Sequence, residues 1–185
     1  MDHGDILLTF AEVSVAFAGF SGVVAVFGRR DPGTWSFADR VRFFMLVHVS
    51  LSSLLLCIVP FGLLALNVAE ASVWRSLSAL FVLYAIVASF HSIRVFLAAS
   101  SSERDEFTPT VIPGILAILA PILALNIYNV AVGATFAPFL VGLIFLLVVA
   151  SYFFARMLVS AFGAGPAAFY EGESVKPSSD EADGD

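Results

Sequence analysis

The sequence predicts an all-α integral membrane protein, a bundle of five transmembrane helices with a disordered acidic C-terminal tail. Two observations predict this class: long apolar runs, and basic residues that gather on one side of them. Hydrophobic residues make up 59% of the chain and its mean hydropathy is +0.96, whereas soluble domains are roughly 45–50% apolar. A helix needs about 20 residues to cross a bilayer core. Five apolar runs have this length: Ile6–Gly28, Phe43–Leu66, Ser76–Leu97, Val111–Val130 and Ala137–Phe162.

The chain divides into a transmembrane domain, residues 1–162, and a tail, residues 163–185. The tail is rich in Gly, Pro, Ser and acids, with six acids against Lys176, so we expect it to be disordered. The remainder is nearly neutral and has no basic patch of the kind that nucleic-acid binding requires. The single cysteine, Cys57, excludes an intramolecular disulfide and is interpreted as a small buried side chain.

The distribution of positive charge predicts the orientation. No basic residue precedes the first run, and Arg29 and Arg30 follow it directly, unlike a cleavable signal peptide. Five spans then place the N-terminus outside and the C-terminus in the cytoplasm, with only Arg75 outside. A four-span alternative leaves one run unplaced and divides these charges. Abundant Arg suggests a bacterial protein, and hence the cytoplasmic (inner) membrane. The residues predicted inside are Arg29, Arg30, Arg40, Arg42, Arg94, Arg104, Arg156 and Lys176.

Local signals mark where several helices begin. Ser36 followed by Asp39 resembles a capping box and predicts the start of the second helix near Phe37. Asp39 and Arg42 are spaced to pair, and we expect an exposed pair of little energetic value. Ser72 is the predicted N-cap of the third helix, after a tight turn.

Two other signals concern the loops and the interiors of the helices. Thr108 followed by Pro109 predicts the cap of the fourth helix. Pro60 and Pro121 lie inside predicted spans, where each permits a kink.

Glu12, Asn126 and Asn129 form a predicted intramembrane polar site. An ionisable residue within a span is a functional candidate by default. At a rise of about 1.5 Å per residue, Glu12 lies about 7 Å to the outer side of the midplane, and Asn126 reaches a similar depth. We expect Glu12 to face the protein interior at the level of Asn126. Two interpretations stay open: an ion or proton site near Pro121, or a hydrogen bond that locks two helices together.

His48, His91 and Arg94 form a predicted inner polar cluster, because both histidines fall at equal depth on adjacent antiparallel helices. The cluster is either a pH-sensitive gate or relay, or a hydrogen-bonded group near the lipid headgroups. We expect no metal or other cofactor. Zinc requires three or four ligands at one level in the membrane, and Glu12 lies on the other side of the membrane from both histidines.

The first run is dense in small residues. Ser14, Ala18 and Gly22 form one stripe, and Ala16 and Gly19 flank Glu12 on another. This spacing lets helix backbones approach closely, so we predict that the first stripe faces other helices. Packing is the expected role, with a pore lining as the alternative.

Two resemblances bear on activity. Gly19-Phe20-Ser21-Gly22 resembles the GxSG nucleophile motif of rhomboid proteases, which would imply a serine hydrolase with His91 or His48 as base. Rhomboids, however, have at least six spans and carry the motif in a later helix. We therefore predict no enzyme activity. More broadly, residues 11–60 loosely resemble a group of small multi-pass bacterial membrane proteins, which implies no particular activity.

The best functional interpretation is a small oligomeric permeation or transport component for an ion, a proton or a small solute. Its basis is the intramembrane Glu12 together with the mid-span proline Pro121, since such prolines free backbone carbonyls inside a membrane. The alternative is a non-catalytic membrane-embedded scaffold or partner subunit. The expected partners are the lipid bilayer and either further copies of the chain or another membrane protein.

Overall fold

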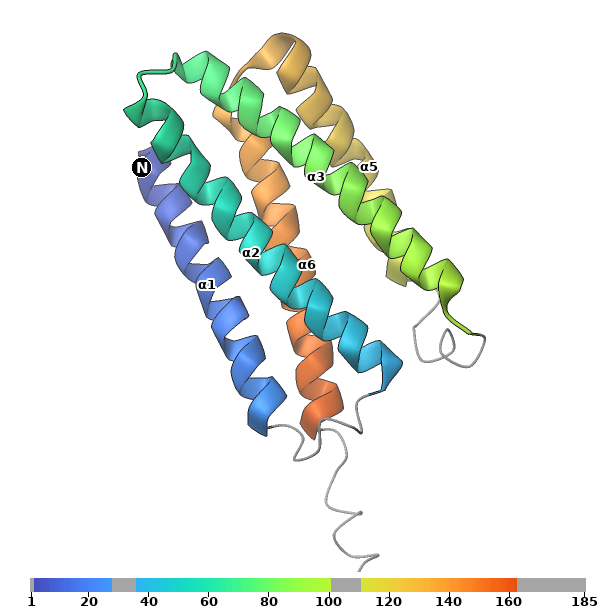
Figure 1. The fold of residues 1–185 in the computed structure, drawn as a ribbon. Helices are drawn as coiled ribbons and strands as arrows, with labels where there is room; N and C mark the ends of the chain where they lie inside the picture. The colour runs from blue at the N-terminus through green and yellow to red at the C-terminus, as the bar shows by residue number, and fades with distance from the viewer. Residues whose placement is uncertain (1, 28–35, 101–110, 163–185) are drawn as a thin grey trace, which may run out of the picture.

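The computed structural model describes residues 2–27, 36–100 and 111–162, and these are all helical apart from short turns (Figure 1). Five helices are long and apolar enough to cross a membrane, which confirms the predicted all-α fold and the number of long apolar helices. The tail and the predicted cap at Thr108 lie outside the described residues. The elements are α1 (His3–Phe27), α2 (Phe37–Ala65), α3 (Glu70–Ala98), α5 (Val111–Tyr128), the short π-helix η2 (Asn129–Gly133) and α6 (Phe136–Phe162).

The helices form two groups that join near one end of the bundle. α1, α2 and α6 pack closely together, and α3 lies beside α5. We call the end that carries the α2–α3 and α5–α6 turns the hairpin end, and the opposite end the loop end. Figure 1 shows α2 and α3 running side by side, while α3 and α5 diverge from α1 and α6 toward the loop end.

The α2–α3 turn is closed by a left-handed asparagine. Asn67 has φ of 57°, a conformation that Asn tolerates better than most residues. Its N–H donates to the carbonyl of Leu64 at 2.9 Å, and the N–H of Val68 donates to that of Leu63 at 3.2 Å. These two bonds are the Schellman pattern, which satisfies the last carbonyls of a helix.

The predicted start of one helix is confirmed, and that of another is wrong. The hydroxyl of Ser36 accepts a hydrogen bond from the backbone N–H of Asp39 at 3.2 Å, as an N-cap does. α3 instead begins at Glu70, so Ser72 lies inside its first turn and is not its N-cap. The Asn67 turn ends early enough for α3 to begin two residues before the serine.

The core lies where α2, α3 and α6 meet. Leu46, Phe81 and Leu143 are fully buried there. Gly142 is needed at the crossing of α3 and α6, because a Cβ atom at this position would lie 2.9 Å from Cε2 of Phe81. A larger residue would therefore push the two helices apart.

The outside of the bundle is apolar. Leu55, Leu83 and Val148 are each 60% exposed or more. Soluble proteins rarely expose apolar surface on this scale, and a bilayer is the solvent in which such a surface is stable. The exposed apolar side chains are thus consistent with helices that are long and apolar enough to cross a membrane.

Candidate functional site

Glu12 lies on the exposed side of α1 in the single chain, and not in the interior where we expected it. α1 packs against α2 and α6, whereas α5 packs against α3 and α6, and the two helices lie on opposite sides of the bundle (Figure 1). The structure therefore does not bring Glu12 and Asn126 together, and the hydrogen bond that was one of the two interpretations is not formed within the chain. Similar depth along the bundle axis does not fix the direction in which a side chain points.

Asn129 is fully buried and connects three elements. Its amide nitrogen donates to the hydroxyl of Ser78 at 2.8 Å and to the carbonyl of Thr135 at 2.9 Å. Its amide oxygen accepts from the N–H of Thr135 at 2.9 Å and from the hydroxyl of Thr135 at 3.3 Å. The side chain thus joins α3 and the start of α6 to η2, which is a structural arrangement.

Asn126 occupies a separate buried position one turn earlier. Its amide nitrogen donates to the carbonyls of Ile122 and Pro138, both at 3.0 Å. Its amide oxygen has no hydrogen-bond partner among the described residues. Asn126 and Asn129 are thus near each other at the hairpin end, but both serve the connection between α5 and α6.

The predicted inner cluster is divided in the structure. His48 stacks on Tyr84 with ring centroids 5.5 Å apart, and the Tyr84 hydroxyl lies 3.3 Å from Nδ1 of His48. His91 is exposed and lies seven residues beyond Tyr84, about 10 Å along α3. Arg94 is also exposed, with its guanidinium 4.3 Å from the centroid of the Phe90 ring. Tyr84, which the cluster prediction did not include, is the partner that His48 finds.

The small residues of α1 face in two directions. Ser14 is fully buried, and its hydroxyl bonds that of Ser53 on α2 at 3.0 Å and the carbonyl of Phe10 at 2.7 Å. Ala18 is partly buried. Gly22, although predicted to face another helix, is exposed, and a Cβ atom there would meet nothing within 4 Å. The stripe therefore turns away from α2 along its length.

Asp39 and Arg42, which were predicted to form an exposed pair, form a largely buried pair near the loop end. Asp39 is only 7% exposed. Its Oδ1 accepts from Nη1 of Arg42 at 3.2 Å and from the hydroxyl of Ser160 at 2.7 Å. α6 covers the pair, and no local pattern in the sequence indicates that the end of α6 reaches the start of α2.

An aromatic group at the hairpin end was not predicted either. Oε1 of Glu70 accepts from Nε1 of Trp74 at 3.1 Å and lies 3.6 Å from Nδ1 of His3. The His3 ring is 4.3 Å, centroid to centroid, from that of Phe136. These contacts hold the start of α1 against α3 and α6. The four-residue spacing of Glu70 and Trp74 on one helix was the available signal.

The serine of the rhomboid-like motif is engaged within its own helix. Ser21 is fully buried, and its hydroxyl donates to the carbonyl of Ala18 at 2.7 Å. No hydrogen bond joins it to a histidine in the described part of the chain. Across the same residues, no group of three or more His, Cys, Asp or Glu side chains is placed to hold a metal ion.

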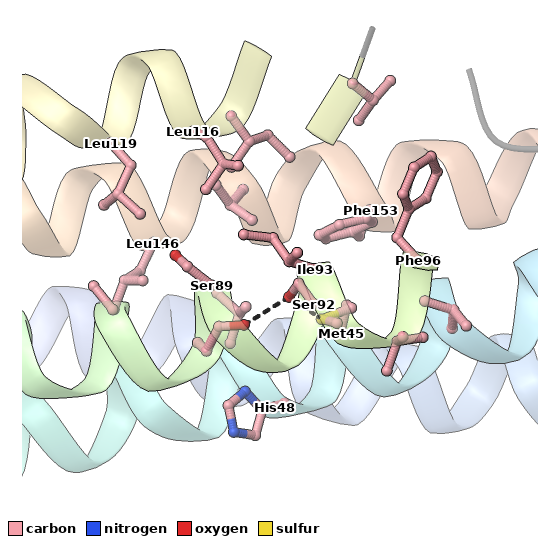
Figure 2. A pocket seen from close by; sticks show the side chains of 18 of the residues that line it. Met45, His48, Ser89, Ser92, Ile93, Phe96, Leu116, Leu119, Leu146 and Phe153 are labelled. Carbon is pink, nitrogen blue, oxygen red and sulfur yellow. Dashed lines mark hydrogen bonds between the residues drawn. The ribbon is translucent and has the colours of Figure 1, made fainter. Parts of the chain in front are cut away.

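A cavity of about 130 Å³ lies between α2, α3, α5 and α6, in the half of the bundle next to the loop end (Figure 2). Leu119, Leu146 and Val149 form part of its buried wall, and His48 and Ile93 lie at exposed positions around it. The wall is almost entirely apolar. Among the side chains that the structure describes, none from α1 contributes to it.

No protein-family model, curated protein or solved structure matches this chain.

Proposed function

We propose that the chain is a subunit of a small homo-oligomeric membrane assembly that permits permeation of an ion, a proton or a small solute. The observation that carries the proposal is the exposure of Glu12 on a helix of membrane-spanning length. In this assembly, the Glu12 side of α1 faces another copy. The chain acts without enzymatic chemistry.

The energetics favour covering Glu12. A charged side chain facing hydrocarbon near the centre of a bilayer costs about 2.5–3.5 kcal/mol on insertion scales. A second copy relieves this cost, because it covers the side chain with protein and offers it hydrogen-bonding groups in place of lipid. The hydroxyl of Thr9, also exposed, lies three residues away on the same side of α1.

The surroundings of Glu12 suit close helix contact. Ala16 and Gly19 are exposed beside it, and a Cβ atom at Gly19 would meet nothing within 4 Å. Small residues let a neighbouring backbone approach, and this is how helices associate in membranes. We call the surface formed by Glu12, Ala16 and Gly19 the Glu12 face.

A polar route between copies is favoured over one through a single chain. The buried amide of Asn129 and the hydroxyl of Ser14 hydrogen-bond within the protein. The cavity near the loop end is apolar. The described interior of one chain therefore offers no continuous set of polar groups to a permeating ion, whereas the Glu12 face presents a carboxyl group to a neighbour.

We also propose that the hairpin end lies outside a bacterial inner membrane and the loop end in the cytoplasm. Arg40, Arg94 and Arg156 lie in the halves of α2, α3 and α6 next to the loop end, and Arg75 lies near the hairpin end. Loops rich in Arg and Lys stay in the cytoplasm.

Mass measurement in mild detergent and flux assays in liposomes test the function. We expect wild-type protein to be oligomeric and to conduct. Glu12→Gln should keep the oligomer, since the amide still hydrogen-bonds, and should lose flux. Glu12→Leu should lose flux and weaken association. Ser151→Leu is the matched control, because Ser151 is exposed on α6 and its hydroxyl bonds the Leu147 carbonyl of its own helix.

A scaffold is the second candidate, and it is favoured by the internally satisfied polar groups. In that case the Glu12 face binds a different membrane protein. An oligomer or complex without flux in the wild type supports this alternative. A wild-type monomer whose flux equals that of empty liposomes contradicts the permeation proposal.

A further inference from the structure

The cavity near the loop end has a wall that suits hydrocarbon. Its polar side chains are His48, Tyr84, Ser89 and Ser92. His48 and Tyr84 bond each other. The hydroxyl of Ser92 bonds the carbonyl of Ala88 at 2.8 Å and Sδ of Met45 at 3.9 Å (Figure 2). A buried water needs two to four polar partners, and the surface of this wall is almost entirely apolar. The cavity is therefore poorly suited to water or to a polar solute.

The position of the cavity gives hydrocarbon access to it. α2 and α3 stay in contact beside the cavity, through His48 and Tyr84 and through the 3.9 Å hydrogen bond from the Ser92 hydroxyl to Sδ of Met45. The cavity extends from this contact to α5 and α6. Ile93 is exposed beside the opening, while Leu119 and Leu146 are buried deeper. All three lie within helices of membrane-spanning length. In a bilayer, an exposed position on such a helix faces lipid chains, so hydrocarbon reaches the cavity on the side of Ile93.

We propose that this cavity holds the end of one acyl chain of a membrane lipid, taken from the leaflet at the loop end. Its volume of about 130 Å³ is close to that of an engineered apolar cavity of roughly 150 Å³ that stays dry and binds benzene. It therefore fits a short segment of a chain, and no headgroup. An empty cavity forfeits dispersion contacts on its walls, and the chain segment restores them.

This site is independent of the Glu12 face. None of the described side chains of α1 lines the cavity, and the cavity holds no group on which permeation depends. The two proposals can therefore fail separately. A chain that conducts nothing can still bind lipid here, and a conducting oligomer can lack the lipid.

Photo-crosslinking tests the site. The full-length protein is reconstituted in phosphatidylcholine liposomes with a trace of phosphatidylcholine that carries a diazirine near the end of one acyl chain. After irradiation, labelled peptides are mapped by mass spectrometry. We expect enriched labelling of the peptides containing Ala88 and Leu116, which line the cavity. Ala88→Phe fills the space and should abolish that enrichment.

Ala79→Phe is the matched control, because Ala79 is exposed on α3 and lies outside the cavity wall. This variant should label as the wild type does. Thermal unfolding in detergent reports whether each variant folds, and Ser92→Leu fills the same space if Ala88→Phe does not fold. Labelling spread evenly over exposed positions overturns the proposal, as does undiminished labelling in a folded, filled variant.

A second measurement tests the dry state of the cavity. Ala88→Cys, in a Cys57→Ala background, should resist a membrane-impermeant maleimide in liposomes and react only after unfolding in detergent. Rapid reaction in intact liposomes would show an aqueous cavity and would overturn the assignment to an acyl chain.

Discussion

The hydroxyl of Ser160 donates a 2.7 Å hydrogen bond to Oδ1 of Asp39, which lies 121 residues earlier in the chain. The bond ties the end of α6 to the start of α2 and helps to satisfy a buried carboxylate that also pairs with Arg42 at 3.2 Å. Removing one partner of a buried charge is costly, because the charge remains without full compensation.

We expect Ser160→Ala to lower the free energy of unfolding by about 1.5–3 kcal/mol, the range for hydrogen bonds to charged groups. Denaturation in mixed micelles measures the change. Ser151→Ala is the control on the same helix, since its hydroxyl is exposed and bonds the Leu147 carbonyl one turn away. Equal effects of the two substitutions would show that the contact with Asp39 adds nothing.

Gly142→Ala should separate α3 from α6. The added Cβ atom would lie 2.9 Å from Cε2 of Phe81, and overpacking of a core typically costs about 1–3 kcal/mol. Gly62→Ala is the control, because a Cβ atom there meets nothing within 4 Å, and it should be neutral or slightly stabilising. Thermal unfolding of both variants checks the prediction, which fails if Gly142→Ala is as stable as the wild type.

Gly133 and Asn129 should be energetically coupled. A Cβ atom at Gly133 would lie 2.6 Å from Oδ1 of Asn129, so Gly133→Ala displaces the side chain that holds Ser78 and Thr135. Asn129→Ala alone should cost about 1–3 kcal/mol for the polar groups that it leaves unsatisfied. In a double-mutant cycle, Gly133→Ala should cost less once Asn129 is alanine. Strictly additive costs would mean that the contact is not a source of strain.

Leucine substitutions on α1 should separate folding from assembly. Ser14→Leu places a large side chain in the buried contact with Ser53 and should destabilise the single chain. Gly22→Leu projects into open space within the chain and should leave its unfolding midpoint unchanged. Circular dichroism during heating distinguishes the two. A Gly22→Leu variant that unfolds at the same lowered temperature as Ser14→Leu would contradict the observed exposure of Gly22.

Axial features were predictable from the sequence, and directions around each helix were not. The lengths of the apolar runs indicated five helices, and the cap at Ser36 was placed correctly. The pairing of Glu12 with Asn126, one of two interpretations, is not formed because α1 packs against α2 and α6, whereas α5 packs against α3 and α6. Depth follows from counting residues along a helix, whereas direction depends on which helices become neighbours.

Long-range partners were missed for a related reason. The spacing of Asp39 and Arg42 shows that they can pair, but their burial depends on Ser160, which is remote in sequence. α3 begins earlier than predicted because Asn67 adopts a left-handed conformation and ends α2 sharply. Asn67 and Ser72 can both be seen in the sequence. Which of them decides where α3 begins depends on the conformation of the turn.

The contacts of Asn129 also bear on the order in which the protein assembles. Its bonds to Thr135 span only six residues, so they can form as soon as α5 and α6 make a hairpin. The bond to Ser78 spans 51 residues, and the closure of α6 against Asp39 spans 121. Contacts between distant segments carry a larger loop-closure entropy and form more slowly. We therefore expect the α5–α6 hairpin to form early in folding. The docking of the end of α6 onto α2 is expected to be a late step that completes the bundle.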